Sequence, residues 1–112
     1  MNDNTFTEDP EHRLNLRNLE LADYDDLKII MDLVYPGLED VLQEKKFRAQ
    51  ISTFGEGQIC IEDHGKVVAA AFSLIVDYDK FGDHHTYDQI TGDAYLTTHD
   101  PRGDVLYGVE VV

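Results

Sequence analysis

Residues 58–76 read QICIEDHGKVVAAAFSLIV, and this stretch decides the fold. Two runs rich in β-forming residues, 58–62 and 66–78, flank the short segment 63–65, whose Gly65 can supply a positive φ. The pattern predicts an antiparallel hairpin. The second run is almost continuously apolar from Val67 to Val76, which is typical of a central strand covered on both faces.

Two helical stretches precede the hairpin. Asp23 is the expected N-cap of a helix whose apolar residues recur at the spacing i, i+3, i+4, i+7, namely Leu27, Ile30, Met31 and Val34. Residues 36–37, Pro-Gly, end that helix. The second stretch presents one apolar face, made of Phe47, Ile51 and Phe54, and stops at residues 55–57, Gly-Glu-Gly.

Further strands are predicted at both ends of the chain. Residues 14–17 alternate apolar and polar side chains, as in a strand with one buried face, and 105–112 form the last strand. Between the hairpin and that strand, residues 79–104 are rich in Asp, His, Thr and Gly, with a helical turn expected near Tyr87–Ile90. The prediction is an α/β (α+β) domain: a mostly antiparallel sheet of about four strands with two helices.

Length and charge bound the domain and its partners. A chain of 112 residues holds one small domain, with 1–12 as a flexible acidic tail and 13–112 as the folded part. The net charge of −14 disfavours nucleic acid and anionic membrane surfaces as partners. No apolar run approaches the ~20 residues of a membrane span, and the N-terminus lacks signal-peptide character, so a cytoplasmic location is expected.

Four segments resemble a known family. They are LELADYDDL at 19–27, EGQICIEDHGKVV at 56–68, IVDYDKFGD at 75–83 and HDPRGDVLYGVEV at 99–111. Together they resemble the N-terminal half of a GNAT-type N-acetyltransferase domain. The last two segments resemble in particular GNAT domains that precede a carbon-nitrogen hydrolase (nitrilase-like) domain.

The resemblance implies transfer of an acetyl group from acetyl-CoA to an amine, carried by a small molecule or a peptide. It also implies that the family's pyrophosphate-binding loop, with its spaced glycines, would follow residue 112. We therefore expect acetyl-CoA to be the cofactor of the complete domain. We expect a chain truncated before that loop to bind no acetyl-CoA and to be inactive alone.

The last strand carries the candidate catalytic residues. Glu110 is the natural general base for amine deprotonation, although a solvent-facing strand glutamate fits the same pattern. Tyr107 can serve as a proton donor near the amine or the leaving thiolate, or as a core aromatic. The resemblance implies that the backbone N–H groups of Val109, Glu110 and Val111 polarise the acetyl carbonyl.

The segment 79–104 supplies candidate ligand contacts. His84, Tyr87 and His99 are expected to line the acceptor pocket in the complete domain. The mixture of His and Asp in this segment leaves a second hypothesis, an independent protein that binds a metal or a small ligand. No H-x-x-x-H or H-E-x-x-H spacing occurs, so no metal site is predicted.

A non-catalytic role is the other alternative. The apolar strand 105–112 would present unpaired N–H and C=O groups if it lay at a sheet edge. Another copy of the chain could pair with that edge. The hypothesis is an interaction or dimerisation module, and a homo-oligomer through this strand is expected.

Overall fold

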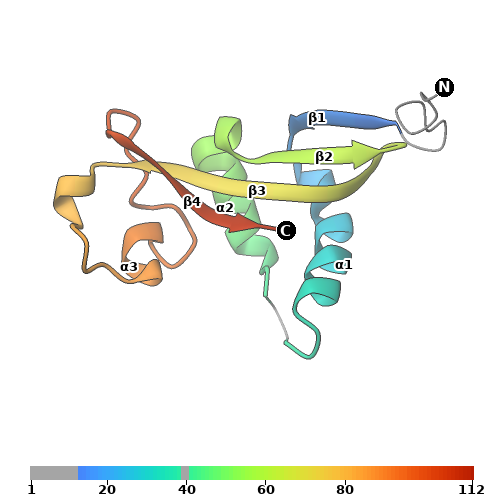
Figure 1. Ribbon diagram of the computed structural model, residues 1–112, viewed down its shortest axis with the longest axis horizontal. Helices are drawn as coiled ribbons and strands as arrows, with labels where there is room; N and C mark the ends of the chain where they lie inside the picture. Colours follow the sequence, from blue (N-terminus) through green and yellow to red (C-terminus); the bar gives the residue numbers. More distant parts are fainter. Residues whose placement is uncertain (1–12, 39–40) are drawn as a thin grey trace, which may run out of the picture.

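The structure is a computed structural model that describes residues 13–38 and 41–112. One four-stranded sheet has the order β1-β2-β3-β4, with every neighbouring pair antiparallel, as Figure 1 shows. The strands are β1 (Leu14–Asn18), β2 (Ile59–Asp63), β3 (Lys66–Val76) and β4 (Val105–Val111). This confirms the predicted fold class. The predicted acidic tail, 1–12, lies outside the described residues.

The predicted hairpin between β2 and β3 is confirmed. Asp63 pairs with Lys66, so that only His64 and Gly65 form the turn. Both turn residues have positive φ, 55° and 81°, which is the conformation that matches the twist of two-residue hairpins. Glycine adopts it without a steric cost, and this local chemistry explains why the hairpin could be read from the sequence.

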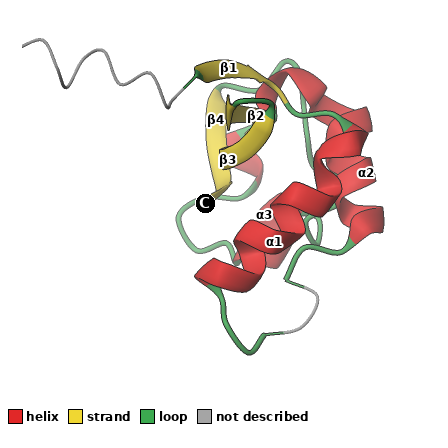
Figure 2. Cartoon of the chain, turned by 90° about the vertical axis from the view of Figure 1, so that its right-hand side faces the viewer, coloured by secondary structure: helices red, strands yellow, loops and turns green. Residues whose placement is uncertain are grey.

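Three α-helices and three short 3-10 turns complete the described part of the chain. The helices are α1 (Tyr24–Val34), α2 (Glu44–Phe54) and α3 (Tyr87–Thr91), and the turns are η2 (Leu21–Asp23), η3 (Gly55–Gly57) and η4 (Tyr78–Lys80). Figure 2 shows the helices on one side of the sheet. Within the described part of the chain, no helix has both the length and the apolar content to cross a membrane.

The core lies between the helices and the inner face of the sheet. Phe47 of α2 is fully buried and meets Phe72 of β3 edge-on, with ring centroids 6.4 Å apart. Leu27 and Met31 of α1 and Leu74 of β3 are buried in the same cluster. The predicted helix faces are therefore correct at these positions, whereas Val34 lies off the buried face and is exposed.

The prediction that β3 is covered on both faces is wrong for the described residues. Phe72 and Leu74 on the inner face are buried, whereas Ser73 and Ile75 on the outer face are only half-buried. On β1, Leu14 and Leu16 are 68% and 66% exposed, although their alternation predicts burial. The reason is that the helices cover one side of the sheet, so its outer face is apolar but open.

Asp23 occupies the predicted N-cap position of α1, but its side chain makes no capping hydrogen bond to that helix. Its carboxylate accepts hydrogen bonds from both Nη atoms of Arg17, each at 2.8 Å, and from the N–H of Glu20 at 2.7 Å. The Nε of Arg17 donates to Glu62 at 2.9 Å. Arg17 lowers the pKa of Asp23, mainly by hydrogen bonding to its charged form. This ionic network joins β1, β2 and the turn before α1.

Residues 79–104 form an ordered excursion rather than a simple loop. The predicted helical turn near Tyr87 is confirmed as α3, which starts with a capping box between Thr86 and Gln89. Gly92 ends the helix in a left-handed conformation. Ile90 and Leu96 are fully buried and attach the segment to the core.

Candidate ligand pocket at the bulge in β4

The pairing of β3 with β4 contains a bulge. Ser73 pairs with Gly108 and Phe72 with Glu110, so that Val109 is an extra residue on β4. An extra residue reverses the alternation of side chains beyond it. Glu110 consequently lies across from the inward-facing Phe72, on the helical side of the sheet, and is half-buried.

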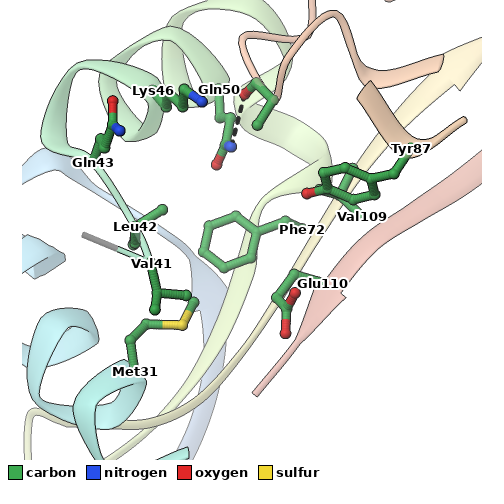
Figure 3. A pocket seen from close by; sticks show the side chains of 11 residues that line it. Met31, Val41, Leu42, Gln43, Lys46, Gln50, Phe72, Tyr87, Val109 and Glu110 are labelled. Carbon is green, nitrogen blue, oxygen red and sulfur yellow. Dashed lines mark hydrogen bonds between the residues drawn. The ribbon is translucent and has the colours of Figure 1, made fainter. Parts of the chain in front are cut away.

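The bulge forms one wall of a small pocket between the sheet and the helices (Figure 3). Its apolar surface comes from Met31, Leu42, Phe72 and Val109, and its polar groups include Gln50, Tyr87 and Glu110. The volume is about 50 Å³. A single water needs roughly 10–15 Å³ measured in this way, so the pocket suits the end of a ligand rather than a whole cofactor.

Tyr35 holds the carboxylate of Glu110. Its hydroxyl donates to Oε2 of Glu110 at 2.5 Å, and it is the only hydrogen-bond donor to that carboxylate among the described residues. The bond and the negative charge of Glu110 raise the pKa of Tyr35, because both favour the neutral phenol. Tyr35 is therefore protonated at neutral pH and orients Glu110, which leaves Oε1 for a ligand.

A second phenol faces the same pocket. Tyr87 is the first residue of α3, and burial raises its pKa, with a smaller contribution from the charge of Glu110. Two neutral phenols thus lie near one carboxylate. Such an arrangement can bind a cation or a hydrogen-bond donor and can accept a proton at Glu110.

The structure brings together some of the residues predicted from the sequence. Tyr87, Val109 and Glu110 line the pocket. The side chain of Val111 is exposed on the outer face of the sheet. The catalytic and binding roles assigned to these residues stay predictions.

Three other predicted residues lie outside the lining of this pocket. The hydroxyl of Tyr107 is 3.3 Å from Nε2 of His85, while His84 is exposed.

His99, the third, lies against α2. It stacks on Phe54 with ring centroids 4.3 Å apart, and its Nδ1 accepts the N–H of Ile75 at 3.0 Å. Burial lowers the pKa of His99, so the imidazole is neutral at pH 7. Its observed contacts are those of a packed, hydrogen-bonded side chain.

Sequence reasoning missed Tyr35 and Gln50. Tyr35 precedes Pro36 at the end of α1, and its distance of 75 positions from Glu110 gives no local signal. Gln50 lies within the polar-looking part of α2 yet is buried. The single available clue was its place one position before Ile51, on the edge of the predicted apolar face.

The described residues contain no group of three or more His, Cys, Asp or Glu side chains placed to hold a metal ion. Strand β4 lies at the edge of the described sheet. Because Val112 and Ala70 exchange backbone hydrogen bonds, the N–H of Val111 points away from β3 and could donate to a carbonyl oxygen such as that of an acetyl group. Residues 109–111 bring no cationic side chain that could hold phosphate groups.

The chain is similar in sequence to known proteins over most of its length. No protein-family model matches the chain. The chain is 34% identical over 102 residues to the probable hydrolase YhcX of Bacillus subtilis, a match that covers 91% of this chain and 20% of that protein. It is 28% identical over 101 residues to the uncharacterized N-acetyltransferase YkwB of the same organism, covering 88% of this chain and 45% of that protein.

A solved structure is also similar to this chain in fold. The crystal structure of the loading GNATL domain of CurA from Lyngbya majuscula superposes with a TM-score of 0.70 at 24% identity. That match covers 88% of this chain and 47% of the other. The chain thus has a GNAT-like fold and spans less than half the length of each of these three proteins.

Proposed function

We propose that this chain is the acceptor side of an N-acetyltransferase-like domain, which transfers an acetyl group from acetyl-CoA to an amine. The observation that carries the proposal is the bulge in β4, which turns Glu110 into a small pocket. The GNAT-like fold and the N-acetyltransferase relative support the reaction class. The location of Glu110 supports its role as the base.

Glu110 would accept the proton that the amine releases as its nitrogen forms a bond to the acetyl carbon, while the carbon–sulfur bond of the thioester would break and CoA would leave as the thiolate. Tyr35 is a positioning residue in this scheme, because it holds Oε2 and presents Oε1 to the incoming amine. The apolar wall excludes water and so strengthens the interaction between the carboxylate and the amine. Tyr87 keeps its proton at neutral pH and can donate a hydrogen bond into the pocket.

When bound, acetyl-CoA supplies the thioester whose acetyl group is transferred. Of the backbone N–H groups of Val109, Glu110 and Val111, that of Val111 points away from β3, because Val112 and Ala70 exchange backbone hydrogen bonds, and it would hold and polarise the acetyl carbonyl. The apolar Val109 side chain lies between that edge and the pocket, since it lines the latter. The acetyl group and the amine would then meet at the bulge.

A hydrolase neighbour is part of the proposal. The match to the probable hydrolase YhcX covers only 20% of that protein. We infer that domains of this type accompany a hydrolase domain in some longer proteins, in line with the family resemblance of segments 75–83 and 99–111.

A second candidate function is self-association. On the outer face of the sheet, Leu16 pairs with Ile61 and Ile59 with Ala71, which pairs in turn with Val111. These five residues are uncharged, and the charged pair of Asp63 and Lys66 lies at one end of the same face. The net charge of −14 opposes contact between charged surfaces of two copies. The outer face of the sheet and the edge of β4 together favour a second copy of this chain as the partner that covers them.

Acetyl transfer to a panel of primary amines, measured in the complete natural protein, tests the leading proposal. We expect Glu110→Gln to lower kcat/KM by about 10²-fold or more, because the substitution removes the base but keeps the shape. Glu56→Gln, at an exposed position of η3, is the matched control and should act like wild type. Wild-type rates for Glu110→Gln would refute the assignment.

A further inference from the structure

Gln50 of α2 carries an unusual buried oxygen. The residue is 3% exposed, and its Nε2 donates to the carbonyl of Ala94 at 2.9 Å. Its Oε1 is the only buried side-chain polar atom of the described residues that has no hydrogen-bond partner. An unpaired buried acceptor costs about 1–3 kcal/mol, and folded proteins pair the large majority of such groups. A ligand donor would remove this cost.

The direction of that oxygen is fixed by its surroundings. The carbonyl of Ala94 can only accept, so turning the amide over would place two oxygens against each other. Ala94 is itself in a left-handed conformation, with φ of 68°, and its N–H donates to Oγ1 of the buried Thr91 at 3.0 Å. The turn after α3 thus holds the Gln50 amide in one orientation.

Oε1 of Gln50 is directed into the pocket. Figure 3 shows the bond to Ala94 as a dashed line and Oε1 on the other side of the amide, toward Phe72. Glu110 lies beyond Phe72, on the opposite wall. Lys46, the one cationic residue among the described residues of the lining, has its Nζ over the ring of Tyr95, 5.5 Å from the centroid. The pocket therefore presents two acceptors across a small apolar space.

We propose that Gln50 is the residue that selects the ligand of this pocket: its Oε1 accepts one N–H of an entering amine while Glu110 accepts another. The inference rests on the proposed function, which makes an amine the ligand. A primary ammonium has three N–H donors and can satisfy both acceptors. A tertiary ammonium has the same charge but a single N–H, and a quaternary ammonium has none.

The experiment is an NMR titration of the ¹⁵N-labelled 112-residue chain with butylamine, N,N-dimethylbutylamine and butyltrimethylammonium. The amide shifts of Val109 and Glu110 report binding in the pocket. We expect wild type to bind butylamine about 3- to 10-fold more tightly than the dimethyl compound, the ratio that one hydrogen bond provides. In Gln50→Met this ratio should fall to about one. If methyl bulk alone caused the preference, the ratio would persist in the variant.

A second readout separates this role from a structural one. Gln50→Met loses the bond to Ala94 but also removes the unpaired oxygen, so it should unfold near the wild-type temperature. Thr53→Met, at an exposed position of α2 outside the pocket lining, should keep the wild-type ratio. Equal wild-type affinities for the primary and tertiary amines would overturn the inference even if Gln50→Met failed to fold.

The inference and the proposed function can fail separately. If Glu110→Gln weakens butylamine binding while Gln50→Met keeps the wild-type ratio, Gln50 is not the selecting residue and the proposed base stands. If butylamine produces no shifts at Val109 and Glu110 in wild type, the amine site is wrong, and the inference falls with it.

Discussion

The substitution Asp23→Asn tests how much the ionic network of Arg17, Asp23 and Glu62 contributes to the stability of the fold. The new side chain keeps the shape but loses the charge and turns one acceptor into a donor. Two hydrogen bonds from Arg17 at 2.8 Å and one from the N–H of Glu20 at 2.7 Å depend on this carboxylate. Hydrogen bonds to charged groups contribute about 1.5–3 kcal/mol each when well buried.

The stability that Asp23→Asn is expected to lose is smaller than the summed free energies of those three hydrogen bonds. The side chain of Arg17 is 25% exposed, and Glu62 still pairs with it in the variant. We therefore expect the free energy of unfolding to fall by about 2–3 kcal/mol. Urea unfolding measures it. With a slope of about 1–1.5 kcal/mol per molar for a domain of this size, the midpoint should fall by roughly 2 M.

The same substitution has a predicted pH dependence. Arg17 lowers the pKa of Asp23 in the folded state, so the stabilisation is present above the ordinary value of about 3.9 and is lost as pH falls through the folded value. Wild type and Asp23→Asn should therefore converge in acid, as pH falls below the lowered pKa of Asp23 in the folded state. Asp32→Asn, on the exposed face of α1, is the control and should stay within about 0.5 kcal/mol of wild type. A difference below about 1 kcal/mol at neutral pH, or one that persists unchanged in acid, refutes this account of the network.

Three further predictions concern other parts of the molecule. Gly103→Ala should lower the free energy of unfolding, measured with urea, by about 2 kcal/mol or more, because a Cβ at this position would lie 2.3 Å from the carbonyl oxygen of Val76. Gly55→Ala is the control and should leave that free energy unchanged, because a Cβ at Gly55 would have no neighbouring atom within 4 Å. Glu110→Gln should move the pKa of Tyr35 back toward its ordinary value in an absorbance titration of tyrosinate, and Tyr35→Phe identifies which phenol titrates. The contribution of the Tyr35–Glu110 pair to stability is present at neutral pH and is lost as pH rises through the raised pKa of Tyr35. Identical titration curves for wild type and Glu110→Gln would contradict this prediction. Sedimentation equilibrium should show a dimer that Val111→Lys abolishes, whereas a monomeric wild type at high concentration would rule out pairing through β4.

The elements that the sequence predicted well depend on local chemistry. The hairpin follows from Gly65 at a positive φ, and α1 follows from the spacing of Leu27 and Met31. Such signals act within a few residues and set the type of an element, whereas the burial of single residues such as Val34 and Leu16 depends on tertiary packing. The sequence predicted about four mostly antiparallel strands but not their order, β1-β2-β3-β4, which comes from the structure.

The site depended on features that no local pattern carries. The inward direction of Glu110 comes from a bulge, and the bulge exists only in the register between β3 and β4. If side chains alternated strictly from the inward-facing Tyr107, Glu110 would lie on the outer face of the sheet. The partner of Glu110, Tyr35, is 75 positions away. The open outer face of the sheet likewise reflects where the helices pack, which the apolar run in β3 does not encode.

The most direct test of the central claim is the pH dependence of acetyl transfer to a primary amine, compared between wild type and Glu110→Gln in the complete natural protein. If Glu110 removes the proton from the amine, the defect of the variant is large near about pH 7. It then shrinks toward about pH 9, because amines with a pKa of about 10.4 increasingly lose that proton to solvent. A defect that stays constant across this range, or no defect at all, would show that Glu110 is not the base.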